Sequence, residues 1–220
     1  MPNWVDCAVG LYSTNKDDIK RLQSRVKYVL KHDMSNTKYS SKNGFGAGWL
    51  GNILAKHHIK WDKTRCRGWI DDVSDIYQSK DYYYVIVYTQ TAWCAITEPW
   101  DAILKKSYKS VQYVTCALDE NMSWGVNTDV DNIIFSDRYY VSLCYPNPEP
   151  KSQYDMEYID EYCEDTTNVI NFINSIATQL GYEPFAENTP FDKIKNSEFV
   201  KYIEDHEGDL SIIEYETDFS

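Results

Sequence analysis

The chain has 220 residues, with 22 Lys+Arg against 34 Asp+Glu, and its formal net charge is −12. Because 43% of the residues are hydrophobic, the chain can bury a core, which excludes a disordered polyelectrolyte. No apolar run approaches the length of about 18 residues that a membrane span needs, and the N-terminal residues lack the pattern of a secretion signal. We therefore expect a cytoplasmic protein that does not contact a membrane.

The first elements in chain order are a strand and a helix. Apolar and polar residues alternate over residues 5–11, which is the period of a half-buried strand. Asn15 and Asp18 form a helix start, and apolar residues recur at helical spacing to about Lys31. A polar loop over residues 33–47 and a short helix with Leu50 on its buried face are expected next.

The middle of the chain is richer in β-forming residues. Segments 69–77 and 82–93 predict a hairpin, and Thr97 followed by Pro99 predicts a helix start. Further strand-like segments follow, at residues 111–118, 123–129 and 133–145. The predicted order is therefore β, α, insertion, β, β, α, β, β, β.

Prolines at 146–150 predict a boundary. We expect an α+β protein in which residues 1–146 form a ferredoxin-like antiparallel sheet with helices on one face. The inserted loop and short helix occupy about residues 33–68. Residues 147–220 are expected to form an acidic α/β extension packed on this domain, with a helix at about residues 167–180.

Several short segments carry a family resemblance. They are Met1-Pro2-Asn3-Trp4, Cys66-Arg67-Gly68-Trp69, Thr91-Ala92-Trp93, Ala117-Leu118-Asp119-Glu120 and Trp124-Gly125. Together they resemble the YubB ferredoxin-like family of phage and plasmid proteins over about residues 1–145. The resemblance implies a ferredoxin-like fold and an origin in a mobile element, hence the cytoplasm of an infected or plasmid-bearing bacterial host. It implies no catalytic chemistry.

The sequence contains no clear motif for a metal site, a cofactor site or a catalytic site. The six cysteines are widely spaced, and the adjacent His57 and His58 diverge on a helix, so we expect no metal site. Residues 46–51 match G-x-G-x-x-G, but no strand precedes them, and we interpret them as a loop before a short helix. We therefore predict no catalytic residue, no cofactor and no enzyme.

Charge is segregated along the sequence. Residues 16–67 contain 13 Lys+Arg and 4 Asp+Glu, whereas residues 111–220 contain 5 and 23. The two halves either neutralise each other in the fold or leave an acidic surface. If residues 154–165 form a helix, their carboxylates lie along one flank and tyrosines spaced by four lie opposite the core. A solvated acidic helix with packed tyrosines is the alternative.

Our leading hypothesis is a non-enzymatic phage or mobile-element accessory protein that inhibits a host defence protein, as anti-CRISPR proteins do. Its acidic half would mimic nucleic acid and enter the basic cleft of a nucleic-acid-handling partner such as a nuclease. The predicted partner-binding residues are Tyr154, Asp155, Glu157, Tyr158, Asp160, Glu161, Tyr162, Glu164 and Asp165.

Two alternatives remain open. The first is a protein that sequesters a nucleotide or other small ligand through cations and stacking tryptophans of the N-terminal region. Its predicted residues are Arg21, Arg25, Trp49, Lys60, Trp61, Arg65, Arg67 and Trp69. The second is direct nucleic-acid binding by the ferredoxin-like sheet, which the net negative charge disfavours because phosphate contacts need cations.

Overall fold

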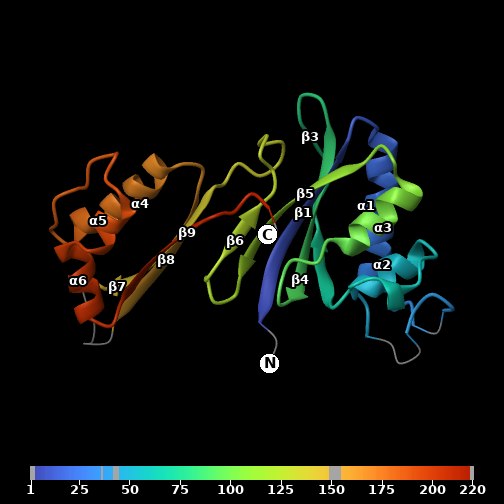
Figure 1. Cartoon of the computed structure of the whole chain (residues 1–220), viewed down its shortest axis with the longest axis horizontal. Coiled ribbons are helices and arrows are strands. Elements are labelled where there is room, and N and C mark those ends of the chain that lie inside the picture. Colours follow the sequence, from blue (N-terminus) through green and yellow to red (C-terminus); the bar gives the residue numbers. More distant parts are fainter. Residues whose placement is uncertain (1–2, 36, 42–44, 149–154, 219–220) are drawn as a thin grey trace. The chain divides into compact units, whose positions relative to one another are not determined.

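The computed structural model describes residues 3–35, 37–41, 45–148 and 155–218. It is an α+β structure with antiparallel sheets, as predicted. The chain forms two compact units, shown in Figure 1. The N-terminal unit comprises Met1–Phe135 with Thr217–Ser220, and the C-terminal unit comprises Ser136–Glu216.

An antiparallel sheet in the order β2-β4-β1-β5-β6 forms the N-terminal unit, and the short β3 pairs with β4. Its central strand β1 pairs along its length with both β4 and β5. The strands are β1 (Trp4–Ser13), β2 (Gly68–Val73), β3 (Tyr77–Gln78), β4 (Tyr83–Ala92), β5 (Gln112–Asp119) and β6 (Gly125–Asn127).

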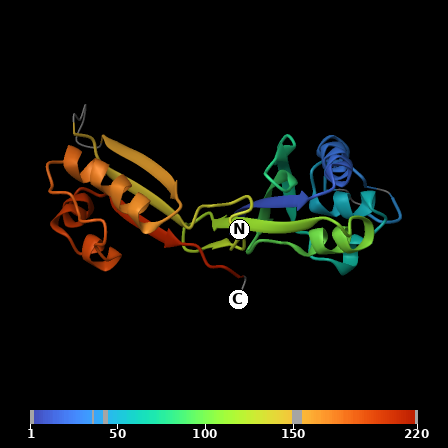
Figure 2. The same cartoon turned by 90° about the horizontal axis from the view of Figure 1, so that it is seen from above.

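Helices cover one face of this sheet (Figure 2). They are α1 (Lys16–Lys31), α2 (Leu50–Lys56), the 3-10 helix η1 (Trp61–Lys63) and α3 (Glu98–Ser107). Asn15 caps α1 as predicted, because its side chain accepts a hydrogen bond from the Asp17 amide. Val5, Val9 and Leu11 point from β1 into the fully buried core beneath these helices, which accounts for the alternation in the sequence.

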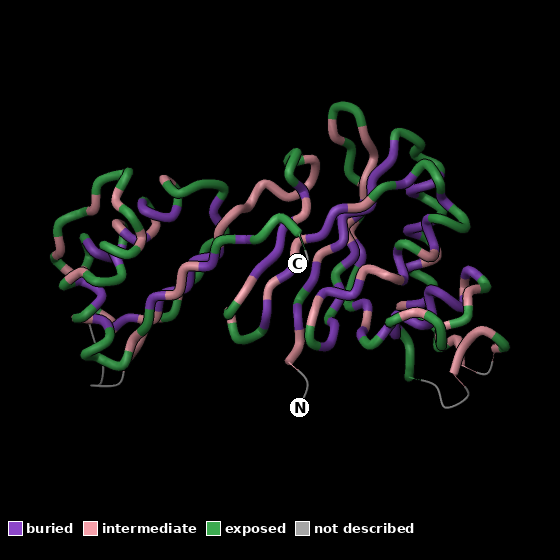
Figure 3. Tube along the Cα trace, in the orientation of Figure 1, coloured by how far each residue is buried: buried purple, intermediate pink, exposed green. Residues whose placement is uncertain are grey.

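The C-terminal unit has a second antiparallel sheet, in the order β8-β7-β9. Its strands are β7 (Tyr139–Pro146), β8 (Met156–Cys163) and β9 (Asp209–Glu214), and its helices are α4 (Thr166–Gln179), α5 (Phe191–Lys195) and α6 (Glu198–Asp205). Apolar residues of α4, α5 and α6 pack with one face of the sheet into a separate core. The buried stretches of Figure 3 follow these two cores.

Two features differ from the sequence-based expectations. The units divide between Phe135 and Ser136, before the predicted boundary at residue 146, because β7 pairs with β8 and β9. The acidic segment predicted as a helix is strand β8 in its described part. Each residue of β8 has a partner on β7, so this long-range pairing overrides the helical spacing of its acidic residues.

No helix in the described part of the chain has the length and apolar character to span a membrane.

Candidate functional site

Acidic residues concentrate in the C-terminal unit. Residues 136–216 contain 5 Lys+Arg and 18 Asp+Glu, which leaves a net charge of −13. The N-terminal unit contains the remaining 17 Lys+Arg and 16 Asp+Glu, a net charge of +1. Five cations cannot neutralise 18 carboxylates within one unit. The C-terminal unit is therefore a strongly acidic body in its own right.

Strand β8 presents two tyrosines and one aspartate on the sheet face opposite the helices. Tyr158, Asp160 and Tyr162 alternate along the strand, and Tyr158 and Tyr162 are 55% and 51% exposed. The hydroxyl of Ser142 on β7 donates to the Tyr158 hydroxyl at 2.8 Å, and the Tyr162 ring lies 5.1 Å from that of Tyr140. We call Tyr158, Asp160 and Tyr162 the tyrosine face.

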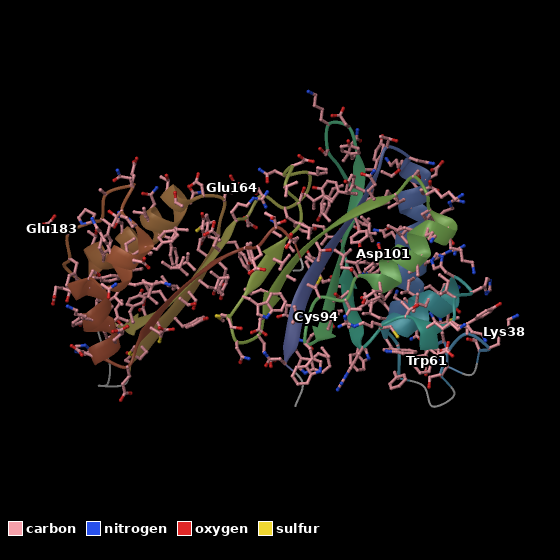
Figure 4. All side chains as sticks on the ribbon, viewed as in Figure 1. Lys38, Trp61, Cys94, Asp101, Glu164 and Glu183 are labelled. Carbon is pink, nitrogen blue, oxygen red and sulfur yellow. The ribbon has the colours of Figure 1, made fainter. Side chains whose placement is uncertain are left out.

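The structure places the other predicted partner-binding residues elsewhere, so they do not form one flank. Tyr145 donates to the Glu157 carboxylate at 2.6 Å, and Ser136 donates to Glu164 at 2.8 Å (Figure 4, Glu164). Glu161 alternates with the tyrosine face and lies on the opposite side of the strand. The Asp165 side chain caps α4.

The remaining two predicted residues precede β8 in the sequence. Asp155 accepts a hydrogen bond from the Asn147 amide through its backbone carbonyl. Tyr154 lies outside the described residues. The predicted helix was wrong, and with it the expected single flank, because residues four apart share a helix face whereas residues two apart share a strand face.

Tyrosines next to β8 are held in the protonated form. Burial, followed by the hydrogen bond to Glu157, raises the pKa of Tyr145 to about 12. Burial and the hydrogen bond with Tyr158 also raise the pKa of Tyr140. The Tyr140 and Tyr145 hydroxyls therefore stay protonated at physiological pH.

Four of the eight residues predicted for ligand binding surround one pocket of about 470 Å³ in the N-terminal unit. They are Trp49, Trp61, Arg67 and Trp69. The pocket is lined in addition by Phe45, Asp62, Thr64 and Cys66, which the sequence analysis missed. Asp62, Thr64 and Cys66 are sequence neighbours of the predicted residues, whereas Phe45 reaches the pocket from the loop before α2 and carries no sequence signal.

The other four predicted ligand-binding residues do not line this pocket. On α1, Arg21 pairs with Asp18, and the Arg25 guanidinium contacts the Nδ1 atom of His57 at 2.9 Å. Arg65 lies 3.4 Å from the Glu98 carboxylate and donates to the Cys94 sulfur. The last of the four, Lys60, immediately precedes η1.

The glycine-rich segment has a packing role. Gly48 has φ +80°, and a Cβ there would lie 2.9 Å from the Ile70 carbonyl oxygen. Its amide donates to the Val29 carbonyl and its carbonyl accepts from the Ile70 amide. A Cβ on Gly51 would lie 2.1 Å from the Trp49 ring. These glycines therefore permit close contact of the segment with α1, β2 and Trp49.

The helix-free face of the N-terminal sheet combines aromatic and acidic side chains. Tyr88 on β4 is 43% exposed on this face, and Asp6 on β1 accepts from Gln90. Burial and the nearby Asp6 charge raise the pKa of Asp71. Carboxylates repel phosphates, and direct nucleic-acid binding by this sheet stays a prediction.

Among the described residues, no group of three or more His, Cys, Asp or Glu side chains is arranged to hold a metal ion. The six cysteines are free thiols. Burial raises the pKa of Cys7 to about 12 and that of Cys66 to about 11, so both thiols are poor nucleophiles at neutral pH.

Comparison with known proteins found no matching family model, no matching curated protein and no matching solved structure. The resemblance to the YubB family therefore stays a prediction.

Proposed function

We propose that this protein is a non-enzymatic accessory protein of a phage or mobile element, and that its C-terminal unit binds a cationic host protein. The observation that supports this proposal is the net charge of −13 on a unit with only five Lys+Arg. An acidic body of this kind attracts a basic cleft and speeds association at low salt. A nucleic-acid-handling defence protein has such a cleft, and its inhibition is the proposed outcome in the bacterial cytoplasm.

The tyrosine face is the proposed centre of the contact. Tyr158 and Tyr162 expose large, rigid side chains, which are enriched among the residues that dominate binding energy at interfaces. Asp160 lies between them, and Asp209 lies on the same face at the opposite edge strand. A partner with arginines around an apolar patch would complement this arrangement. The acidic mimic is thus a sheet face, in place of the predicted helix.

We also propose that the N-terminal unit follows the ferredoxin-like plan. In support, β1, β2, β4 and β5 are arranged in the order β2-β4-β1-β5, and helices follow β1 and β4 in the chain. A gene neighbourhood rich in counter-defence genes would support the proposed origin.

The decisive experiment is capture of host proteins on the full-length chain at low and high salt. We expect a basic, nucleic-acid-binding protein to be retained at low salt and released at high salt. The triple variant Tyr158→Ala, Asp160→Asn, Tyr162→Ala should weaken the purified complex by about tenfold or more.

A matched control neutralises exposed acids away from the tyrosine face, at Glu183 and Glu187 in the α4–α5 connection (Figure 4, Glu183). It should weaken the same complex only slightly. Recovery of no basic partner, salt-independent binding, or equal losses in the two variants would contradict the proposal.

A further inference from the structure

The pocket of the N-terminal unit is separate from the proposed acidic contact. Its walls are aromatic rings from different elements, namely Phe45, Trp49 at the start of α2, Trp61 in η1 and Trp69 in β2. The rings of Trp49 and Trp61 are 5.5 Å apart and meet edge to face, and the Phe45 ring lies 4.5 Å from Trp49. Figure 4 labels Trp61 among these side chains.

The pocket is lined by both buried and exposed side chains. Trp49 is 4% exposed and Cys66 is 6% exposed, whereas Phe45 is 47% exposed. The volume of about 470 Å³ is within the range of small-molecule sites, about 300–1,000 Å³. The pocket therefore offers flat apolar surfaces to a ligand that enters from the solvent.

Hydrogen bonds fix these walls in place. The Trp69 indole nitrogen donates to the Phe45 carbonyl at 3.3 Å, and the Trp61 amide donates to the Tyr39 carbonyl at 3.4 Å. The fully buried Asn52 donates to the Gly46 carbonyl at 2.8 Å and accepts from the Met34 amide. A preformed site of this kind binds its ligand with less ordering cost.

The segment that supplies much of the pocket lining is rich in cations. Residues 60–67 contain Lys60, Lys63, Arg65 and Arg67 against the single acid Asp62, and of these five residues Arg67 and Asp62 line the pocket itself. Arg65 already pairs with Glu98, whereas Arg67 lines the pocket and has no ion pair with any described residue. An arginine beside aromatic rings suits a ligand that combines a planar ring with a phosphate.

We infer that this pocket binds a planar aromatic anion of the nucleoside-monophosphate class. The base stacks against the tryptophans, and Arg67 binds the phosphate. The Gly48 amide of the glycine-rich segment is bonded to the Val29 carbonyl, so it does not bind the phosphate. The inference goes beyond the proposed function, since it assigns a small ligand to the other unit.

The test is a calorimetric titration of the full-length chain with AMP, CMP, GMP and UMP. The four corresponding nucleosides, inorganic phosphate and choline are the comparison ligands. We expect at least one nucleotide to bind, its nucleoside to bind about tenfold more weakly, and choline not to bind. Absence of nucleotide binding at millimolar concentration, or tighter binding of choline, would overturn the inference.

Variants of Arg67 and Trp61 separate the contribution of the cation from that of the aromatic ring. Arg67→Gln should reduce nucleotide affinity about tenfold and leave nucleoside affinity unchanged. Trp61→Ala should weaken both ligands about tenfold, and Trp61→Phe should restore part of the loss. The matched controls are Arg65→Gln and Trp93→Ala, since neither side chain lines the pocket and Trp93 is 59% exposed. Equal effects of Arg67→Gln and Arg65→Gln would also overturn it.

Discussion

In both units an antiparallel sheet buries one face beneath helices, yet the two bodies differ in the chemistry that they expose. The N-terminal unit contains all seven tryptophans and a net charge of +1, whereas the C-terminal unit contains no tryptophan, nine tyrosines and a net charge of −13. The comparison shows that the same layered architecture tolerates very different surfaces, because buried apolar residues specify the layers.

The tryptophan distribution makes the comparison measurable. Leu11 in β1 and Leu143 in β7 are both fully buried, one in each core. Leu11→Ala should lower the free energy of unfolding of the N-terminal unit by about 2–5 kcal/mol, and Leu143→Ala should do the same to the C-terminal unit. Tryptophan fluorescence during urea unfolding reports the N-terminal unit, and far-ultraviolet circular dichroism reports both.

We therefore expect Leu11→Ala to shift the fluorescence transition and Leu143→Ala to leave it in place. If the two variants shift the fluorescence transition equally, the units unfold as one cooperative block and their separation is only geometric.

Acid should destabilise the N-terminal unit through His57, which has a buried side chain in that unit. Burial, followed by the Arg25 charge, lowers the pKa of His57 from 6.5 to about 3. The unfolded chain therefore binds a proton between these values that the folded chain does not, so stability is lost as the pH falls through this window. The loss should be about 1.4 kcal/mol for each pH unit below 6.5.

The measurement is urea unfolding at pH values from 7 to 4, with tryptophan fluorescence as the signal that reports unfolding. His57→Gln should be less stable at pH 7 but should lose this share of the pH dependence. His206→Gln is the control, because His206 is exposed after α6 in the other unit. If the free energy of unfolding of the His57 variant depends on pH as steeply as that of the wild type, this explanation is wrong.

Two glycines provide the smallest expected effect. Gly48 and Gly181 have φ +80° and φ +82°, so alanine is strained at both by about 1–2 kcal/mol. A Cβ at Gly181 meets nothing within 4 Å, whereas at Gly48 it lies 2.9 Å from a backbone oxygen. Gly48→Ala should therefore lower the melting temperature more than Gly181→Ala, and should also weaken nucleotide binding. Equal melting temperatures would show that the backbone near Ile70 relaxes freely.

Local signals explain which predictions succeeded. Asn15 as a cap and the apolar spacing after it identified α1, and the stripe from Val169 to Leu180 identified α4. Each rests on contacts between residues three or four apart, which the sequence shows directly. The acidic residues of β8 have the same local spacing, but their backbone bonds to β7, and no local pattern reports that partner.

The candidate sites show the same division. The sequence identified three stacking tryptophans and one cation of the pocket, which are Trp49, Trp61, Trp69 and Arg67. That these side chains surround one pocket together with Phe45 depends on how α2, η1 and β2 pack. The sequence by itself determined the α+β class, the main helices and the charge difference, since these follow from residue type and short-range spacing. Only the tertiary structure decided which side chains share a face or a pocket, because strand pairing joins residues that are distant in the chain.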